Sequence, residues 1–259
     1  MRVTRIHVDA PLSVGQQIVL PEQAATHLMR VLRLRAGAAL TLFNGQGGEY
    51  AAELLALERG TARAAIIKQV PIERGAARAA VVQQLPIERE SPLRLTLLQG
   101  ISRGERMDLI VQKATELGIE RLVPIAAEHG VVKLDPIQGI RRVEHWQAIA
   151  ISACEQCGRN RVPHIDPVVT LAKALDALPA EGARLLLDPE GAMTLATVPV
   201  AGAATVLIGP EGGWSETERR LCERTGISAC RLGPRVLRTE TAPLAVLAAL
   251  QALHGDLAR

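Results

Sequence analysis

Residues 204–218, with the sequence ATVLIGPEGGWSETE, decide the fold of this 259-residue chain. The first five residues are a short apolar run that ends at glycine and proline, which is typical of a buried strand. Ser215 and Glu218 have the spacing of a capping box, in which two side chains satisfy the open N–H groups at the start of a helix. The stretch therefore predicts a strand, a glycine-rich loop (residues 209–214) and a helix.

A second arrangement of the same kind follows closely in the sequence. Residues 229–232 are a short predicted strand, and residues 233–242 (GPRVLRTETA) are a predicted loop. Residues 243–253 form a helix rich in Ala and Leu, with Pro243 in the first turn, where its missing N–H costs little. Two loops therefore leave the ends of two strands, and open parallel sheets bind ligands at such strand ends. The alternative is that both loops are ordinary turns.

The composition of the two loops restricts the ligand. Neither loop carries the Lys-Ser/Thr pair of a phosphate-binding loop, and neither fits the dinucleotide-binding pattern G-x-G-x-x-G. Glu211 lies inside the first glycine cluster, where its carboxylate repels a phosphate group. The ligand is therefore expected to be neutral or partly cationic, and S-adenosylmethionine, with adenine, ribose and a sulfonium, fits this description.

The residues before this region alternate between strand and helix patterns from about residue 92 onward. Predicted strands lie at 94–100, 119–125, 162–169 and 183–187, and predicted helices lie at 104–118, 137–158 and 170–178. This alternation is typical of a parallel sheet covered by helices on both faces. Residues 92–259 are thus predicted to be a doubly wound α/β domain.

The N-terminal residues 1–75 read as a small β-rich domain. Short strands at 39–43 and 49–57 flank the turn sequence Asn44-Gly-Gln-Gly-Gly48, which predicts a hairpin. Residues 63–75 are repeated with small changes at 78–90, and two copies are too few for a solenoid. We interpret residues 76–91 as a linker that contains a duplicated segment, with a further strand as the alternative.

The composition excludes several classes of protein. The apolar share of 48% is ordinary for a globular protein, and no apolar run is long enough to span a membrane. The net charge of +3 is compatible with RNA without requiring it. The scarcity of aromatic residues makes a surface built on base stacking improbable. In the absence of a secretory signal, we expect a cytoplasmic location and reduced cysteines.

Cys154 and Cys157 have the spacing of a metal or redox pair, but they lie in a helical context. No second C-x-x-C accompanies them, and His164 alone is a poor third ligand. We therefore interpret the two cysteines as structural thiols and expect no metal.

Two segments, Leu207 to Gly213 and Leu232 to Ala242, resemble the signature of the 16S ribosomal RNA uridine-N3 methyltransferases, a family of the knotted SPOUT superfamily. The resemblance extends to residues 103–118, where Arg106 replaces the usual lysine, and to residues 153–163. It implies methylation of N3 of a specific uridine in small-subunit (16S) ribosomal RNA, with S-adenosylmethionine as the methyl donor.

The resemblance also implies a fold and partners. Residues 1–75 are similar to the PUA-like β-barrel RNA-binding domain of the family, and residues 92–259 are similar to a SPOUT methyltransferase domain with a trefoil knot. A homodimer is implied because SPOUT relatives pair their knots. The apolar helix at 243–253 is either the dimer interface or ordinary core packing. The expected partner is 16S rRNA or the small ribosomal subunit, without a membrane.

The resemblance and the chemistry of methyl transfer together assign candidate site residues. Arg238 is expected to face the uracil oxygens, either Glu240 or a phosphate to take the N3 proton, and Asn160 to bond the uracil edge. For Glu211, the alternative to cofactor binding is a structural role within its own loop. The expected cofactor-binding residues are Leu187, Ile208, Gly209, Pro210, Glu211, Gly213, Leu232, Gly233, Leu237, Thr241 and Ala242. The expected RNA-binding residues are Arg2, Arg5, Arg30, Arg33, Arg159, Arg161 and Arg235.

Two other functions remain open at this point. The first is a SPOUT methyltransferase that acts on tRNA or on another ribosomal position. The second is a non-catalytic RNA-binding protein of ribosome assembly that keeps the fold. Binding of S-adenosylmethionine distinguishes the second from an enzyme.

Overall fold

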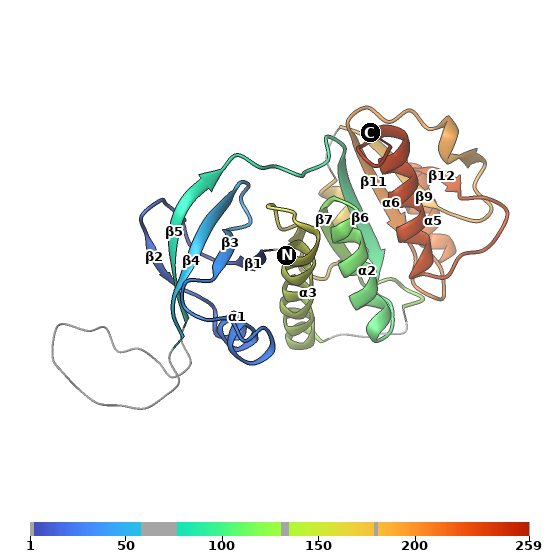
Figure 1. The fold of residues 1–259 in the computed structure, drawn as a ribbon. Helices are drawn as coiled ribbons and strands as arrows, with labels where there is room; N and C mark the ends of the chain where they lie inside the picture. The colour runs from blue at the N-terminus through green and yellow to red at the C-terminus, as the bar shows by residue number, and fades with distance from the viewer. Residues whose placement is uncertain (1–2, 58–76, 131–134, 179–180, 259) are drawn as a thin grey trace. The chain divides into compact units, whose positions relative to one another are not determined.

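The computed structural model describes residues 3–57, 77–130, 135–178 and 181–258 (Figure 1). The chain divides into two compact units. The first unit comprises residues 1–89 together with 158–161, and the second comprises residues 90–157 and 162–259.

The first unit is built on five strands: β1 (Thr4–His7), β2 (Gln17–Val19), β3 (Ala39–Phe43), β4 (Glu49–Leu57) and β5 (Ala77–Leu85). They form one sheet in the order β1-β3-β4-β5-β2. β3 and β4 are the predicted antiparallel hairpin, whereas β1 pairs with β3 in parallel. A short helix, α1 (Glu22–Thr26), continues as a π-helical turn, η1 (His27–Val31), and packs Ala25 and Leu28 into the core of this unit.

The predicted linker at residues 76–91 requires a correction, because β5 occupies most of it and pairs with both β4 and β2. The physical reason is the alternation of small apolar residues. Ala77, Ala79 and Val81 are buried on one face, so this copy of the duplicated segment adds a strand. The first copy, residues 63–75, lies outside the described residues.

Residues 158–161 follow a helix of the second unit in sequence but group with the first unit. Asn160 is completely buried, and its amide nitrogen donates to the carbonyl oxygen of Ile87 at 2.6 Å. The guanidinium of Arg5 donates to Asn160 Oδ1 at 2.6 Å and forms an ion pair with the buried Glu49. The segment is thereby tied to the β-sheet of the first unit by its polar groups.

The second unit contains seven strands: β6 (Arg94–Gly100), β7 (Ile119–Ile125), β8 (His164–Ile165), β9 (Ala183–Leu187), β10 (Met193–Thr194), β11 (Ala203–Ile208) and β12 (Ser228–Arg231). They form an all-parallel sheet in the order β10-β12-β9-β11-β6-β7-β8. This confirms the parallel α/β domain predicted from the alternating pattern. β8 is shorter than the predicted strand at 162–169, and β10 was not predicted.

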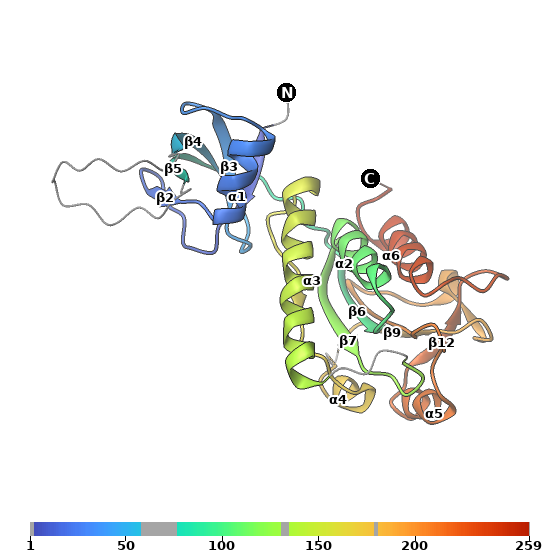
Figure 2. The same ribbon diagram turned by 90° about the horizontal axis from the view of Figure 1, so that it is seen from below.

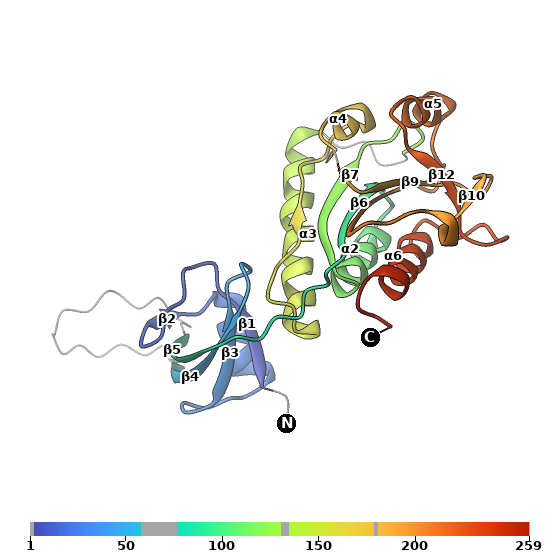
Figure 3. The same cartoon turned by 90° about the horizontal axis from the view of Figure 1, so that it is seen from above.

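Helices cover both faces of this sheet, as Figures 2 and 3 show. One face packs against α2 (Glu105–Glu116), α3 (Pro136–Cys157) and α6 (Thr241–His254), and the other packs against α4 (Leu171–Asp176) and α5 (Glu216–Arg224). Neighbouring residues of β6 point to opposite faces of the sheet. Leu97 packs in the core formed with α2, α3 and α6, whereas Leu98 packs in the core formed with α4 and α5. The sheet is therefore buried on both sides.

The C-terminal helix α6 contributes to the first of these two cores. Val246, Leu247 and Leu250 are fully buried there, so core packing accounts for its apolar face. Among the described residues, the helices are all too short or too polar to cross a membrane.

The predicted helical context of Cys154 and Cys157 is confirmed, since both lie on α3. Cys222 on α5 is buried, and this burial, together with the charge of Glu218, raises the pKa of its thiol to about 11. Cys222 is therefore an uncharged thiol at neutral pH.

Candidate functional site

A pocket of about 510 Å³ opens at the carboxyl ends of β9, β11 and β12. These three strands are neighbours in the sheet order, so the loops that follow them meet at one edge. Two of these loops are the segments 209–214 and 233–242 that the sequence predicted as loops at strand ends. Gly213 and Gly233 have φ values of 69° and 73°, a left-handed conformation that favours glycine, so each loop uses a glycine where the chain turns.

The pocket brings together almost all the residues predicted to bind the cofactor. Thr241 does not line it. The predicted residues that do line it are Leu187, Ile208, Gly209, Pro210, Glu211, Gly213, Leu232, Gly233, Leu237 and Ala242.

The walls also contain residues that the sequence analysis did not single out. Asp188 and Pro189 follow β9 directly, and the tendency of ligands to bind at strand ends could have predicted them as pocket residues. Trp214 and Arg219 enter from the start of α5, and an ion pair of 2.9 Å joins Arg219 to the buried Asp188. Arg106 enters from α2, and no local sequence signal connects it to these loops.

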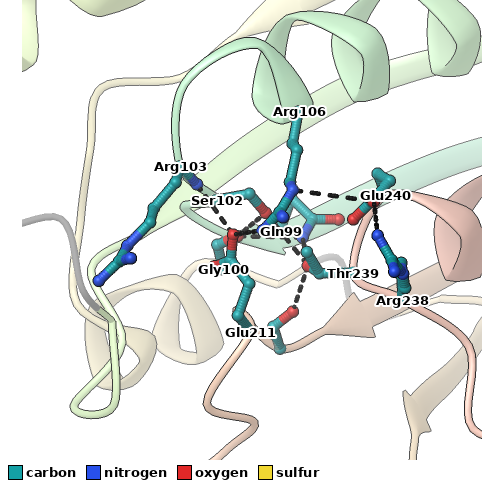
Figure 4. Close-up of polar contacts among 10 residues, drawn as sticks. Gln99, Gly100, Ser102, Arg103, Arg106, Glu211, Arg238, Thr239 and Glu240 are labelled. Carbon is teal, nitrogen blue, oxygen red and sulfur yellow. Dashed lines mark hydrogen bonds and ion pairs between the residues drawn. The ribbon is translucent and has the colours of Figure 1, made fainter.

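Glu211 is held by the start of α2, as Figure 4 shows. Its Oε1 accepts hydrogen bonds from the backbone N–H of Arg103 at 3.1 Å and from the guanidinium of Arg106 at 2.7 Å. Partial burial alone would raise the pKa of Glu211. The backbone hydrogen bonds and the contact with Arg106 outweigh burial, so the pKa lies below its ordinary value. Glu211 therefore carries a negative charge that the protein itself neutralises.

Arg238 and Glu240 lie side by side in the loop that precedes α6 (Figure 4). The Arg238 side chain is 79% exposed, and its Nη1 is 4.0 Å from Glu240 Oε1. Arg106 approaches the same Glu240 oxygen at 3.8 Å. Glu240 Oε2 is buried, and no residue in the described part of the chain forms a hydrogen bond with it. A carboxylate with one unbonded oxygen thus lies beside an exposed guanidinium.

The first glycine-rich loop is anchored at its far end by the predicted capping box. Ser215 Oγ accepts from the backbone N–H of Glu218 at 3.1 Å, and Glu218 Oε2 accepts from the N–H of Ser215 at 2.9 Å. The second oxygen of Glu218 accepts from the N–H of Glu128. These bonds confirm the predicted helix start and fix where the loop ends.

The structure divides the predicted RNA-binding arginines into two groups. Arg5 and Arg159 are buried, and Arg161 is 3.6 Å from Glu88 in an ion pair. Arg30, Arg33 and Arg235 are exposed, and Arg235 lines the pocket. Arg2 lies outside the described residues.

Asn160 belongs to the first unit and is not among the residues that line the pocket. Its amide oxygen and nitrogen are both bonded inside the first unit, to Arg5 and to the carbonyl oxygen of Ile87. The contact with uracil stays a prediction, and the structure shows that both groups of the Asn160 amide already have partners inside the protein.

The all-parallel sheet, covered by helices and with a pocket at its strand ends, defines the class of α/β ligand-binding domains. Residues 89–251 match the family model described as an RNA methyltransferase domain, and residues 20–67 match an RNA methyltransferase PUA domain. The chain therefore belongs to the RNA methyltransferase family, which confirms the resemblance of its two loop motifs.

Relatives along the whole chain agree with this assignment. The ribosomal RNA small subunit methyltransferase E of Buchnera aphidicola is 31% identical over 99% of this chain and 98% of its own length. A crystal structure of a methyltransferase E from Neisseria gonorrhoeae, bound to S-adenosylmethionine, is 38% identical and has a TM-score of 0.86, with coverage of 99% and 100%. A methyltransferase structure from Legionella pneumophila, also with bound S-adenosylmethionine, is 36% identical with a TM-score of 0.89 and the same coverage.

Proposed function

We propose that this protein transfers a methyl group from S-adenosylmethionine to N3 of a specific uridine in small-subunit (16S) ribosomal RNA. The observation that carries the proposal is the pocket at the ends of β9, β11 and β12, because the two family signatures form most of its walls. The relatives that match the chain along its whole length include a ribosomal RNA small subunit methyltransferase E bound to S-adenosylmethionine.

The chemistry of the pocket suits this methyl donor. Its volume of about 510 Å³ lies in the ordinary range for a small-molecule site. Apolar side chains suit adenine and ribose, and a lining with both carboxylates and arginines suits a ligand that carries groups of both charges, as S-adenosylmethionine does with its sulfonium, ammonium and carboxylate. The proposed cofactor-binding residues are those predicted from the sequence, with Asp188 and Trp214 added to them.

The methyl acceptor needs activation, because N3 of uridine carries a proton and is a poor nucleophile until the proton leaves. The donor supplies an electrophilic methyl group on a sulfonium. The N3 lone pair forms the new carbon–nitrogen bond as the carbon–sulfur bond breaks, and the electron pair of that bond remains on sulfur as a neutral thioether.

The chain contributes two groups to this step in our proposal. Glu240, which lines the pocket, accepts the N3 proton, and the exposed guanidinium of Arg238 stabilises the negative charge that spreads over the uracil oxygens.

Contacts with RNA are proposed for the arginines whose side chains are exposed. Arg235 at the pocket, and Arg30 and Arg33 after α1, are suited to phosphate groups because a guanidinium binds them through two N–H groups. Arg161 is a further candidate because its side chain is 59% exposed, whereas the side chains of Arg5 and Arg159 are turned inward and are less suited to this role.

The loops after β11 and β12 are further proposed to form the trefoil knot of SPOUT proteins, and two chains to form a homodimer. The knot is supported by the close packing of these loops, in which Thr239 donates a hydrogen bond to the carbonyl oxygen of Gly209 at 2.9 Å. Sedimentation equilibrium of the purified protein tests the dimer, and a monomer at micromolar concentration contradicts it.

The function is tested by methyl transfer from labelled S-adenosylmethionine to small ribosomal subunits that lack the modification, followed by nucleoside analysis. We expect the label on 3-methyluridine. Label on another nucleoside contradicts the proposed substrate and favours a different RNA position or tRNA. If the protein neither binds S-adenosylmethionine nor transfers its methyl group, the result favours the non-catalytic ribosome-assembly protein.

A further inference from the structure

Thr239 separates the two proposed catalytic residues, Arg238 and Glu240, in the sequence. It is 8% exposed, and its hydroxyl donates a hydrogen bond to the carbonyl oxygen of Gly209 at 2.9 Å (Figure 4). Gly209 belongs to the loop after β11, whereas Thr239 belongs to the loop after β12. One hydroxyl thus connects the two loops that form the pocket.

The same hydroxyl is bonded to the end of β6. Gln99 Nε2 donates to Thr239 Oγ1 at 3.3 Å, and Ser102 Oγ is 3.1 Å from it. A hydroxyl has one proton to donate and two lone pairs that accept. Because the proton of Thr239 goes to Gly209, we assign the proton of Ser102 to the shorter of its two contacts, Thr239 Oγ1 at 3.1 Å, and not to the carbonyl oxygen of Gly100 at 3.4 Å. All three hydrogen-bonding positions of the Thr239 hydroxyl are therefore used inside the protein.

The surrounding packing leaves this hydroxyl little freedom. Gln99 and Ser102 are fully buried. A Cβ placed on Gly100 would lie 2.5 Å from the ring of Pro210. The backbone at the end of β6 therefore packs directly against the Pro210 ring in the loop after β11. Thr239 is consequently held against a rigid surface, and its neighbours in the sequence take their positions from it.

We propose that Thr239 is a positioning residue: its hydroxyl fixes the loop that carries Arg238 and Glu240 against the Gly209 loop and the end of β6. This inference rests on the proposed function. Its consequence is kinetic, because displacing two catalytic groups by about 1 Å is enough to lower a rate by roughly a hundredfold.

The test compares Thr239→Val, which keeps the shape and removes the hydroxyl, with Thr239→Ser, which keeps the hydroxyl. We expect Thr239→Val to lower kcat for methyl transfer by about 10- to 100-fold, with KM for S-adenosylmethionine changed less than about threefold. We expect Thr239→Ser to restore kcat to within about threefold of the wild type. A matched control is Thr115→Val in α2, since Thr115 is also buried and its hydroxyl donates to the carbonyl oxygen of Val111 in the same helix.

The proposal is overturned if Thr239→Val keeps the wild-type kcat, or if Thr239→Ser is as slow as Thr239→Val. It is also overturned if Thr115→Val slows turnover equally, because loss of any buried hydroxyl then explains the effect. If Thr239→Val does not fold, Ser102→Ala replaces it, and an unchanged kcat in that variant contradicts the proposal. The nucleoside that the wild type labels reports on the proposed function, whereas the ratio of variant to wild-type rates reports on Thr239.

Discussion

At the scale of single residues, two carboxylates at the pocket share one arginine. Arg106 approaches carboxylates from both loops, Glu211 at 2.7 Å and Glu240 at 3.8 Å. Glu211 is the more tightly held of the two, because the backbone N–H of Arg103 also donates to it. We infer that Glu211 supports the loop, whereas Glu240 is held by the longer ion pairs of its Oε1 to Arg106 and Arg238.

Arg238→Ala is expected to lower kcat by about 10- to 100-fold, because the charge that develops on uracil loses its nearest cation. The affinity for S-adenosylmethionine should change little, since the side chain is mostly exposed. Steady-state methyl transfer and titration calorimetry measure the two effects. Arg224→Ala, at the end of α5, is the control and should keep the wild-type rate. Full turnover by Arg238→Ala would remove this residue from the mechanism.

Glu211→Gln is expected to destabilise the protein in a way that depends on pH. The pKa of Glu211 in the folded protein is below its ordinary value of 4.5, so its ionised form stabilises the fold above that value. This contribution is lost as the pH falls through the lowered pKa. Denaturant unfolding should therefore show a difference between wild type and variant at neutral pH that shrinks in acid. A difference that is independent of pH would contradict this assignment.

At the scale of elements, most strands and helices of the second unit were predictable because their signals are local. β11 is an apolar run that ends at glycine, and α5 begins at a capping box. β10 and the π-helical turn were missed because two paired residues and one widened turn leave no periodic pattern. β5 was left open between a linker and a strand because its sequence is a duplicate, and only its pairing with β4 and β2 decides its role.

Ser215→Ala is expected to lower the free energy of unfolding by about 1 kcal/mol, because it leaves the N–H of Glu218 without its capping partner. Denaturant titration measures this change. Thr170→Ala at the start of α4 is a graded comparison, since its capping bond is longer, at 3.5 Å, and its loss should cost less. An equal or larger loss for Thr170→Ala would contradict the role given to the capping box.

At the scale of the whole molecule, the sequence predicted two units but not their exact composition. Residues 158–161 join the first unit although 68 residues of the second unit, from 90 to 157, precede them in the chain. Such a long-range placement has no local signal. The absence of a local signal explains why Asn160 was predicted to be a catalytic residue. A polar residue beside arginines looks the same in the sequence whether it binds RNA or a buried partner in the protein. Arg106 was noted in the sequence as a departure from the family motif, but its place at the pocket was not predicted, since α2 reaches the pocket only in the folded chain.

Asn160→Ala is expected to destabilise the protein by about 2–3 kcal/mol, because it leaves the guanidinium of Arg5 and the carbonyl oxygen of Ile87 without a buried partner. Thermal and denaturant unfolding measure the loss. Methyl transfer per folded molecule should stay within about threefold of the wild type. A variant of normal stability that has lost turnover would instead support the predicted contact with uracil.

The most direct test of the central claim reads the methyl group on the RNA itself. A methyl on N3 removes the proton with which uridine pairs to adenine, so reverse transcription of the modified RNA stops there. Small subunits that lack the modification are treated with the protein, with or without S-adenosylmethionine, and their 16S rRNA is analysed by primer extension. We predict one new stop at a single uridine, which requires S-adenosylmethionine and is strongly reduced with Arg238→Ala. No stop, or a stop that Arg238→Ala leaves unchanged, would contradict the claim that this pocket methylates N3 of uridine.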